Sequence, residues 1–394
     1  MVAVIGKLYG LQHIEAAEDI VSETFLLAAE TWGIKGIPAN PAAWLYAVAK
    51  QKTLYQFRRN HILEQKIMPE LAARQEKQYE EEAPDFSRQN IKDSQLQMLF
   101  AVCNPAIAGE AQIGLALRIL CGFGIDEIAE AFISNKETIN KRLFRAREKL
   151  REEKITMELP PESKLQQRLG NVLHIIYLLF NEGYYSQTQN EILRRDLCLE
   201  AMRLCFMLTD YEKTNLPQTN ALMALMCFHA SRFDARQAGA HKPVLYEQQD
   251  ESLWNKELIQ QGMHYLDLSA QGQALTSYHL EARIAYWHCI REDTAEKWSE
   301  ILQLYDQLAQ INYSPGVALN RVFALYKCCG HETALQAAEQ LNMDSNHFYH
   351  VLLGELYCHT DKEKAREHLN RAYRLAKTQT ERQDIQEKIN SHRD

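Results

Sequence analysis

A run of basic and amide side chains between Gly124 and Lys149 has the residue types that bind DNA. Lysine and arginine hold phosphates, and arginine, lysine and asparagine can also form paired hydrogen bonds with base edges. In a helix-turn-helix these polar residues would lie outside, while apolar residues at helical spacing pack two helices across a tight turn. The candidates are Lys136, Glu137, Thr138, Asn140, Lys141, Arg142, Arg145 and Arg147. The alternative is a basic helix whose charges only keep it soluble.

The sequence has no residues at the spacing of a common catalytic or cofactor motif. It lacks GxGxxG, GxxxxGK[ST] and HExxH, and its 14 histidines are scattered. We expect His174, His279 and His288 to cap or line helix packing. The nine cysteines include no CxxC pair, which favours buried free thiols over metal ligands or disulfides. The sequence therefore predicts no enzyme activity, no cofactor and no metal.

Charge is distributed unevenly along the chain. The net charge is −8, but residues 1–157 hold 20 basic and 21 acidic side chains, whereas residues 158–394 hold 24 and 31. Within the first part, basic residues gather from Lys50 to Arg59 and from Lys136 to Lys154. Local basic helices are what phosphate contacts require, so the overall acidity does not exclude nucleic acid as a partner.

The beginning of the chain and its most apolar run indicate a soluble, cytoplasmic protein without membrane contact. Met1 to Gly10 lacks the basic start, apolar core and cleavage site of a secretory signal. The longest apolar run, Val172 to Phe180, is far shorter than the ~20 residues that span a bilayer.

Composition predicts an all-α protein with two or three domains. Only 10 prolines and 16 glycines occur in 394 residues, of which 46% are hydrophobic. A first helix is expected from Glu15 to Glu30, followed by a loop from Gly33 to Ala39. The helical stripe of that first helix would consist of Ala17, Ile20, Val21, Phe25 and Ala28.

Asn40-Pro41 then signals the start of a helix that should run to about Arg59, because Asn caps a helix and Pro suits its first position. Residues 61–95 are polar and predict a linker with some helix. In the following module, Gly109 to Leu120 and Ile125 to Phe132 should be helices separated by Gly122-Phe123-Gly124. Ser134, with Glu137 three residues later, fits a capping box at the start of the next helix.

After Pro160-Pro161 the pattern changes to paired amphipathic helices that continue to the end. Two late segments resemble each other, Asn320 to Leu341 and His350 to Ala376. In the second, small and aromatic residues approach the spacing of a tetratricopeptide repeat: Leu353, Gly354, Tyr357, Ala365, Leu369 and Ala372.

Several motifs in order resemble one known family. GIDEIAEAFISNKETINKRLFRAREKL is similar to the −35-binding region of extracytoplasmic-function sigma factors of the sigma-70 family, and AEDIVSETF with NPAAWLYAVAKQKTLYQFRRN resembles their region two. LLFNEGYYSQ, LYEQQDESLWNKELIQQG and SPGVALNRVFALY resemble a subgroup with a C-terminal tetratricopeptide-like extension. The resemblance covers nearly the whole chain. It implies region two at 1–60, a linker at 61–95, region four at 96–157 and the helical-repeat domain at 158–394.

The resemblance implies that one helix docks on the clamp helices of core RNA polymerase. Carboxylates that face a basic coiled coil around an apolar anchor give charge complementarity. The residues carried over for this role are Asp19, Ser22, Glu23 and Phe25. From the residues alone, an ordinary acidic helix face would be preferred.

The resemblance also implies that the next helix opens and holds the −10 element of promoter DNA. Its aromatic residues could stack on unpaired bases while its cations follow the backbone. The residues implied are Asn40, Trp44, Lys50, Lys52, Arg58 and Arg59, with Tyr46, Tyr55 and Phe57 interleaved. Trp44 or Phe57 is expected to be buried, and the loop from Gly33 to Asn40 to form part of a pocket for a flipped base.

The chain departs from the subgroup in one motif that contains possible metal ligands. Val102-Cys103-Asn104-Pro105 stands where the subgroup has Cys-Cys-His-Pro, and the lost Cys and His argue against a metal site.

The expected function is that of a sigma factor, with core RNA polymerase and promoter DNA as partners and a C-terminal domain that modulates activity through protein contacts. Two alternatives remain. One is a helix-turn-helix regulator that acts without polymerase, and the other is a helical-repeat scaffold that binds proteins.

Overall fold

A computed structural model describes residues 1–67, 84–132, 134–184, 193–238, 244, 246–272, 274–358 and 360–391. The chain is all-α, and no strand occurs among these residues. It divides into two compact units, Met1–Ile175 and Ile176–Asp394. No helix in the described ranges is long and apolar enough to cross a membrane.

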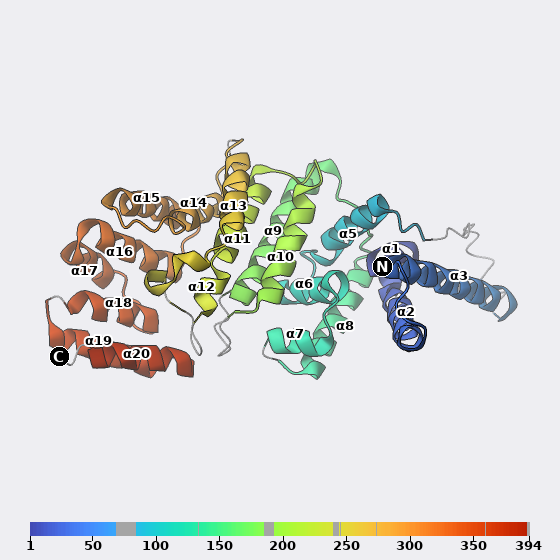
Figure 1. Cartoon of the computed structure of the whole chain (residues 1–394), viewed down its shortest axis with the longest axis horizontal. Helices are drawn as coiled ribbons and strands as arrows, with labels where there is room; N and C mark the ends of the chain where they lie inside the picture. The colour runs from blue at the N-terminus through green and yellow to red at the C-terminus, as the bar shows by residue number, and fades with distance from the viewer. Residues whose placement is uncertain are drawn as a thin grey trace. The chain divides into compact units, whose positions relative to one another are not determined.

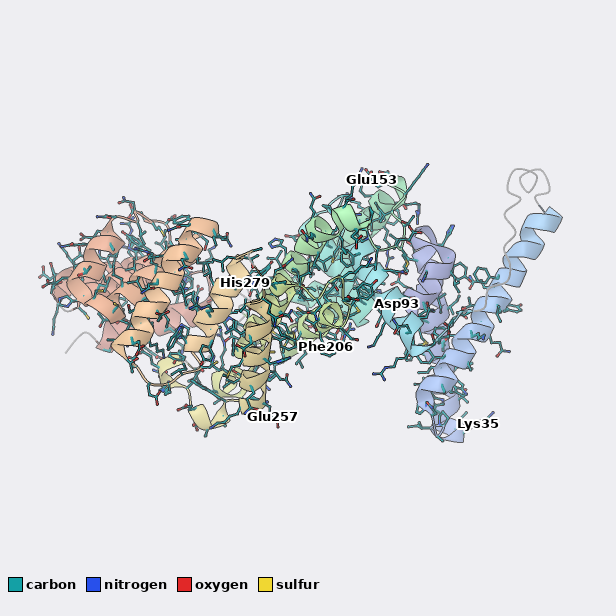
Figure 2. All side chains as sticks on the ribbon, turned by 90° about the horizontal axis from the view of Figure 1, so that it is seen from above. Lys35, Asp93, Glu153, Phe206, Glu257 and His279 are labelled. Carbon is teal, nitrogen blue, oxygen red and sulfur yellow. The ribbon has the colours of Figure 1, made fainter. Side chains whose placement is uncertain are left out.

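The first unit begins with two helices that pack closely, α1 (Val2–Tyr9) and α2 (Ile14–Lys35), joined by the short 3-10 segment η1 (Leu11–His13). A Cβ atom on Gly6 would lie 2.6 Å from the Ile14 side chain, so α1 approaches α2 where Gly6 has no side chain. Helix α2 continues to Lys35, which is labelled in Figure 2, beyond the expected end at Glu30. The loop before the next helix is therefore shorter than predicted.

The buried stripe of α2 differs from the expected one at Phe25. Ala17, Ile20 and Ala28 are buried as predicted, but the Phe25 side chain is 52% exposed. Thr24 lies on the buried face instead, where its hydroxyl donates to the carbonyl oxygen of Ile20 at 2.7 Å. This local hydrogen bond satisfies the hydroxyl, so a polar residue can occupy the core face.

Helix α3 (Pro41–Ile67) begins where the sequence predicts and extends past Arg59. The Asn40 carboxamide oxygen accepts the Ala43 N–H at 3.0 Å, which confirms the cap. The expectation that Trp44 or Phe57 is buried is wrong, because both are only half-buried. Each ring packs instead against one neighbouring ring, which covers part of it.

The rest of the first unit consists of α5 (Arg88–Val102), α6 (Gly109–Ala116), the π-helical η2 (Leu117–Cys121), α7 (Ile125–Ala131) and α8 (Lys136–Glu152). The break at Gly122 is confirmed, since this residue takes a left-handed conformation with φ of 79°. The capping box predicted at Ser134 is wrong. Asn135 is the cap of α8, and its side-chain oxygen accepts the Thr138 N–H at 2.8 Å.

Helix α9 (Glu162–Tyr184) follows the proline pair, and its first half belongs to the first unit. The Asn171 carboxamide donates to the carbonyl oxygen of Cys103 at 2.8 Å and to the Gln112 side chain at 2.9 Å. Arg168 donates to the carbonyl oxygen of Phe100 at 2.5 Å. The compact units thus divide inside α9, whereas the sequence places the division after Met157.

The second unit is a succession of helices in which α11 contacts both α13 and α14, and from α13 onwards each helix packs against the next one along the chain (Figure 1). Its 3-10 turns are η3 (Tyr246–Gln248) and η4 (Glu251–Leu253). Its helices after α9 are α10 (Arg195–Thr209), α11 (Pro217–Ala230), α12 (Phe233–Gln237), α13 (Lys256–Ser269), α14 (Ser277–Trp287), α15 (Ala295–Ile311), α16 (Pro315–Cys329), α17 (His331–Glu339), α18 (His347–Tyr357), α19 (Lys362–Leu375) and α20 (Gln379–Ser391).

The small residues of the predicted repeat allow two helices to approach. A Cβ on Gly354 in α18 would lie 2.7 Å from Leu369 of α19. Leu353, Ala365 and Leu369 are buried. The spacing read from the sequence therefore corresponds to a packed helix pair.

Candidate nucleic-acid interface

Helices α7 and α8 lie side by side and form a packed pair (Figure 1). Ile128 and Ala129 of α7 are buried, and so is every member of the predicted stripe on α8: Ile139, Leu143, Ala146 and Leu150. Helix α6 also approaches α8, since a Cβ on Gly114 would lie 2.9 Å from Leu143. At the start of α7, the Glu127 carboxylate accepts the Gly124 N–H at 2.6 Å. The inner face of α8 is therefore packed against α6 and α7, which fixes the direction in which its outer face points.

Between Lys136 and Arg145, α8 presents most of the predicted DNA-facing residues to solvent. These exposed residues are Lys136, Glu137, Thr138, Asn140, Lys141 and Arg145. Lys136 forms an ion pair with Asp126 of α7 at 2.5 Å, but both side chains are about two-thirds exposed. An ion pair this open to solvent is weak and can exchange for a phosphate.

Arg142 and Arg147 do not lie free on the outside as expected. The Arg142 guanidinium lies 2.9 Å from a Glu110 carboxylate oxygen and over the ring of Phe132. Arg147 is 18% exposed, and its Nη2 donates to Glu18 of α2 at 2.6 Å. Both differences arise because a long side chain can reach a carboxylate on another helix, which the helical spacing of α8 alone does not reveal.

Glu18 is the centre of an ion-pair cluster that joins α2, η2 and α8. Its side chain is 12% exposed and also accepts from Arg118 Nε at 2.9 Å. Arg147 and Arg151 reach Glu15 at 3.8 and 3.7 Å. At the end of α8, a hydrogen bond from Lys149 to Glu153 at 2.8 Å raises the pKa of Lys149. The cations of α8 after Arg145 are thus paired within the protein: Arg147, Lys149 and Arg151.

One residue that the sequence argument missed is Phe144, whose ring is 62% exposed beside the basic residues of α8. Its position outside the apolar stripe, between Leu143 and Arg145, was the available signal. An exposed ring among cations can contact a thymine methyl group or a protein partner.

Helix α3 brings together some of the residues predicted for single-stranded DNA. The Trp44 ring meets Trp32 of α2 edge-on at 5.5 Å, and Phe57 stacks on Tyr9 of α1 at 4.6 Å. Lys50 and Tyr55 are exposed. The side chains of Arg58 and Arg59 lie outside the described residues.

A small open cavity lies beside α3 and was not anticipated from the sequence. It measures about 360 Å³ and is lined by Tyr46, Ala47, Lys50 and residues 84–87. The ring of Phe86, from the segment before α5, stacks on Tyr46 at 4.9 Å. Hydrogen bonds from Ser87 hold the pKa of the Asp85 carboxyl below its usual value. An aromatic ring already covers the Tyr46 face, so a base could stack there only if Phe86 moved.

The residues predicted for polymerase docking all lie on the exposed surface of α2: Asp19, Ser22, Glu23 and Phe25. Glu23 also forms an ion pair with Lys52 of α3 at 2.7 Å. The predicted docking helix and the predicted −10 helix therefore share a solvent-exposed ion pair.

Comparison with known proteins places the chain in a family. Residues 168–270 match the model described as "Family of unknown function (DUF6596)". No solved structure matches the chain. An uncharacterized protein of Rhizobium meliloti (strain 1021) is 32% identical over 375 residues, which cover 94% of this chain and 88% of that protein. The chain belongs to the same family as this Rhizobium meliloti protein.

Proposed function

We propose that the protein is a sigma factor that directs core RNA polymerase to specific promoters in the cytoplasm. The observation that carries the proposal is the polar outer face of α8. It combines exposed cations, an amide and a hydroxyl on a helix whose opposite face is buried against α6 and α7. This is the arrangement by which a helix-turn-helix enters the major groove. The sequence resemblance to region two and region four supplies the second support.

The proposed roles follow the elements of the first unit. Exposed side chains of α2 would dock on polymerase, α3 would hold the −10 element, and the first half of α8 would read the −35 element. In this proposal Asn140 and Lys141 contact base edges, while Lys136 and Arg145 hold phosphates. Arg147 has a positioning role, because its guanidinium is engaged by Glu18. The second unit would be a tetratricopeptide-like domain that modulates transcription through protein contacts.

The proposal is tested by polymerase binding and by run-off transcription from target promoters. The double variant Asp19→Lys, Glu23→Lys reverses two exposed charges on α2. We expect it to lose co-purification with core enzyme and promoter-specific transcripts while its helical content stays unchanged. The fold should survive, because an exposed pair such as Glu23–Lys52 contributes only about 0–1 kcal/mol.

Two control variants separate docking from general charge effects. Glu30→Lys reverses another exposed acidic residue of α2, and Lys52→Gln removes the pair with Glu23 without changing the docking side chains. Both should keep polymerase binding. If the double variant co-purifies as well as the unaltered protein, the sigma proposal is wrong, and a helix-turn-helix regulator without polymerase remains.

A further inference from the structure

Several cations surround the ring of Tyr246 in the second unit. The Cζ atoms of Arg232 and Arg291 lie 5.5 and 5.7 Å from the ring centroid, and Nζ of Lys297 lies 5.4 Å from it. Arg232 immediately precedes α12, and Lys297 is in the first turn of α15. The Tyr246 cluster, as we call Arg232, Tyr246, Trp254, His288 and Lys297, thus combines residues from separate parts of the sequence.

Two of these cations are buried without an ion pair among the described residues. Lys297 is 1% exposed and Arg232 is 7% exposed. Nζ of Lys297 donates to the Tyr246 hydroxyl at 3.1 Å and to the carbonyl oxygen of Ile290 at 2.5 Å, which are both uncharged. Burial lowers the pKa of Lys297 and the nearby Asp293 carboxylate opposes this shift, but the ion pair of Asp293, at 2.8 Å, is with Lys327. Buried charges in proteins are normally paired, because removal of an ion from water costs several kcal/mol.

Unused hydrogen-bonding atoms are found in the same cluster. Arg232 Nε, Trp254 Nε1 and His288 Nδ1 are buried and have no hydrogen-bond partner in the described part of the chain. The rings of Trp254 and His288 lie 6.3 and 5.0 Å from the Tyr246 ring. Arginine and tryptophan side chains only donate, and a neutral histidine can donate through one ring nitrogen. The cluster therefore offers hydrogen-bond donors, together with positive charge that no direct ion pair balances among the described residues.

The electrostatics of the surrounding groups are consistent with excess positive charge. Burial, with Arg232 and Lys297 nearby, lowers the pKa of His288 to about 3. Burial raises the pKa of Tyr246 above its usual value despite the neighbouring arginines, so the phenol does not supply a negative charge. The position of Lys297 in the first turn of α15 adds a cation at the positive end of a helix, where a carboxylate is usually favoured.

We propose that the Tyr246 cluster binds an oxyanion, a phosphate or carboxylate group carried by a small molecule. Arg232 and Lys297 would provide the opposite charge, and Trp254 and His288 would donate hydrogen bonds to its oxygens. Charge-assisted hydrogen bonds of this kind are shorter and stronger than those between neutral groups. The proposal concerns the second unit alone and does not depend on the proposed function in transcription.

The test uses the indole N–H of Trp254 as a probe at the site. The full-length protein, labelled with nitrogen-15, is titrated with inorganic phosphate and separately with succinate, at constant ionic strength set by chloride. The chain has five tryptophans, so the Trp254 indole signal can be assigned by its loss in a Trp254→Phe variant. We expect a saturable shift of this signal with phosphate, succinate or both, and the difference identifies the preferred oxyanion.

Variants determine whether the shift arises at the cluster. Arg232→Gln and Lys297→Met should each weaken the apparent affinity at least tenfold. The matched control is Arg203→Gln, which removes a half-exposed arginine paired with Glu200 and should leave the titration unchanged. Two variants are used because one could fail to fold. No saturable Trp254 shift with either anion, or equal affinity in a folded Arg232→Gln or Lys297→Met variant, would overturn the proposal and leave a purely structural cluster.

Discussion

Two arginines of α8 and two cations of the Tyr246 cluster are placed in opposite electrostatic environments. Arg142 and Arg147 each reach a carboxylate of another helix, at 2.9 and 2.6 Å. Arg232 and Lys297 are more deeply buried and have no such partner among the described residues. The net charges would suggest the opposite, that cations find carboxylate partners more easily in the second part of the chain. Residues 158–394 carry a net charge of −7 and residues 1–157 only −1. The net charge of a region therefore says little about where a cation lacks compensation.

This difference predicts that two substitutions change the stability of the protein in opposite directions. Of the effects predicted here, these two should be the largest. Glu18→Gln leaves Arg118 and Arg147 half-buried without their shared carboxylate, and should lower the free energy of unfolding by about 2 kcal/mol. Lys297→Met replaces a buried ammonium, which has no ion pair among the described residues, by an apolar side chain of similar volume. It should raise the free energy of unfolding by about 1 kcal/mol. Urea unfolding in chloride buffer, free of phosphate and carboxylates, measures both.

A suitable control for these measurements is Glu200→Gln, which breaks the more exposed pair with Arg203 and should change stability by less than about 1 kcal/mol. The comparison fails if Lys297→Met destabilises the protein as strongly as Glu18→Gln, since the ammonium would then be compensated.

A second prediction is that protonation of His288 lowers the stability of the second unit at low pH. The folded-state pKa of His288, about 3, lies below the usual 6.5, so the unfolded chain takes up the proton first. Stability from neutral His288 is therefore complete above pH 6.5 and lost as pH falls from 6.5 towards 3, by at most about 1.4 kcal/mol per pH unit. A His288→Gln variant should show a correspondingly flatter decline.

The pH dependence of stability should be compared between unaltered and His288→Gln protein. The difference between them is the informative quantity, because another buried group stabilises the folded state as pH falls. Burial raises the pKa of the Glu281 carboxyl to about 7, so its protonation favours the folded state as pH falls below 7. Parallel pH profiles for unaltered and His288→Gln protein would contradict the assignment of His288.

The smallest expected effect is on DNA binding. It distinguishes the exposed Arg145 of α8 from Arg147, which is paired with Glu18. Arg145 is exposed, so Arg145→Ala should weaken binding to −35 duplex for all sequences and lower the salt slope by about one unit. Arg147→Ala should leave that slope unchanged, because Glu18 already engages its guanidinium. Binding at several salt concentrations, to matched and mismatched duplexes, measures both. An equal loss of slope in the two variants would show that Arg147 leaves Glu18 and contacts phosphate.

Local rules predicted the helical elements well but misplaced some of their details. The start of α3 followed from Asn40-Pro41, and the buried stripe of α8 followed from its helical spacing. The start of α8 shifted by one residue because Ser134 and Asn135 are both good caps, and only backbone geometry selects between them. Phe25 was misplaced because apolar type does not ensure burial, whereas Thr24 could be buried through a local hydrogen bond.

The sequence by itself determined the all-α class, the main helices and the polar outer face in the first half of α8. These properties depend on residues within a few positions of each other, whose pattern repeats with the helical period. Tertiary structure alone decided that Arg147 meets Glu18, 129 positions away, and that Lys297 donates to Tyr246, 51 positions away. Such pairings depend on which helices and turns meet in space. Whether a cation is paired, free or buried without a partner is therefore settled only when the chain has folded.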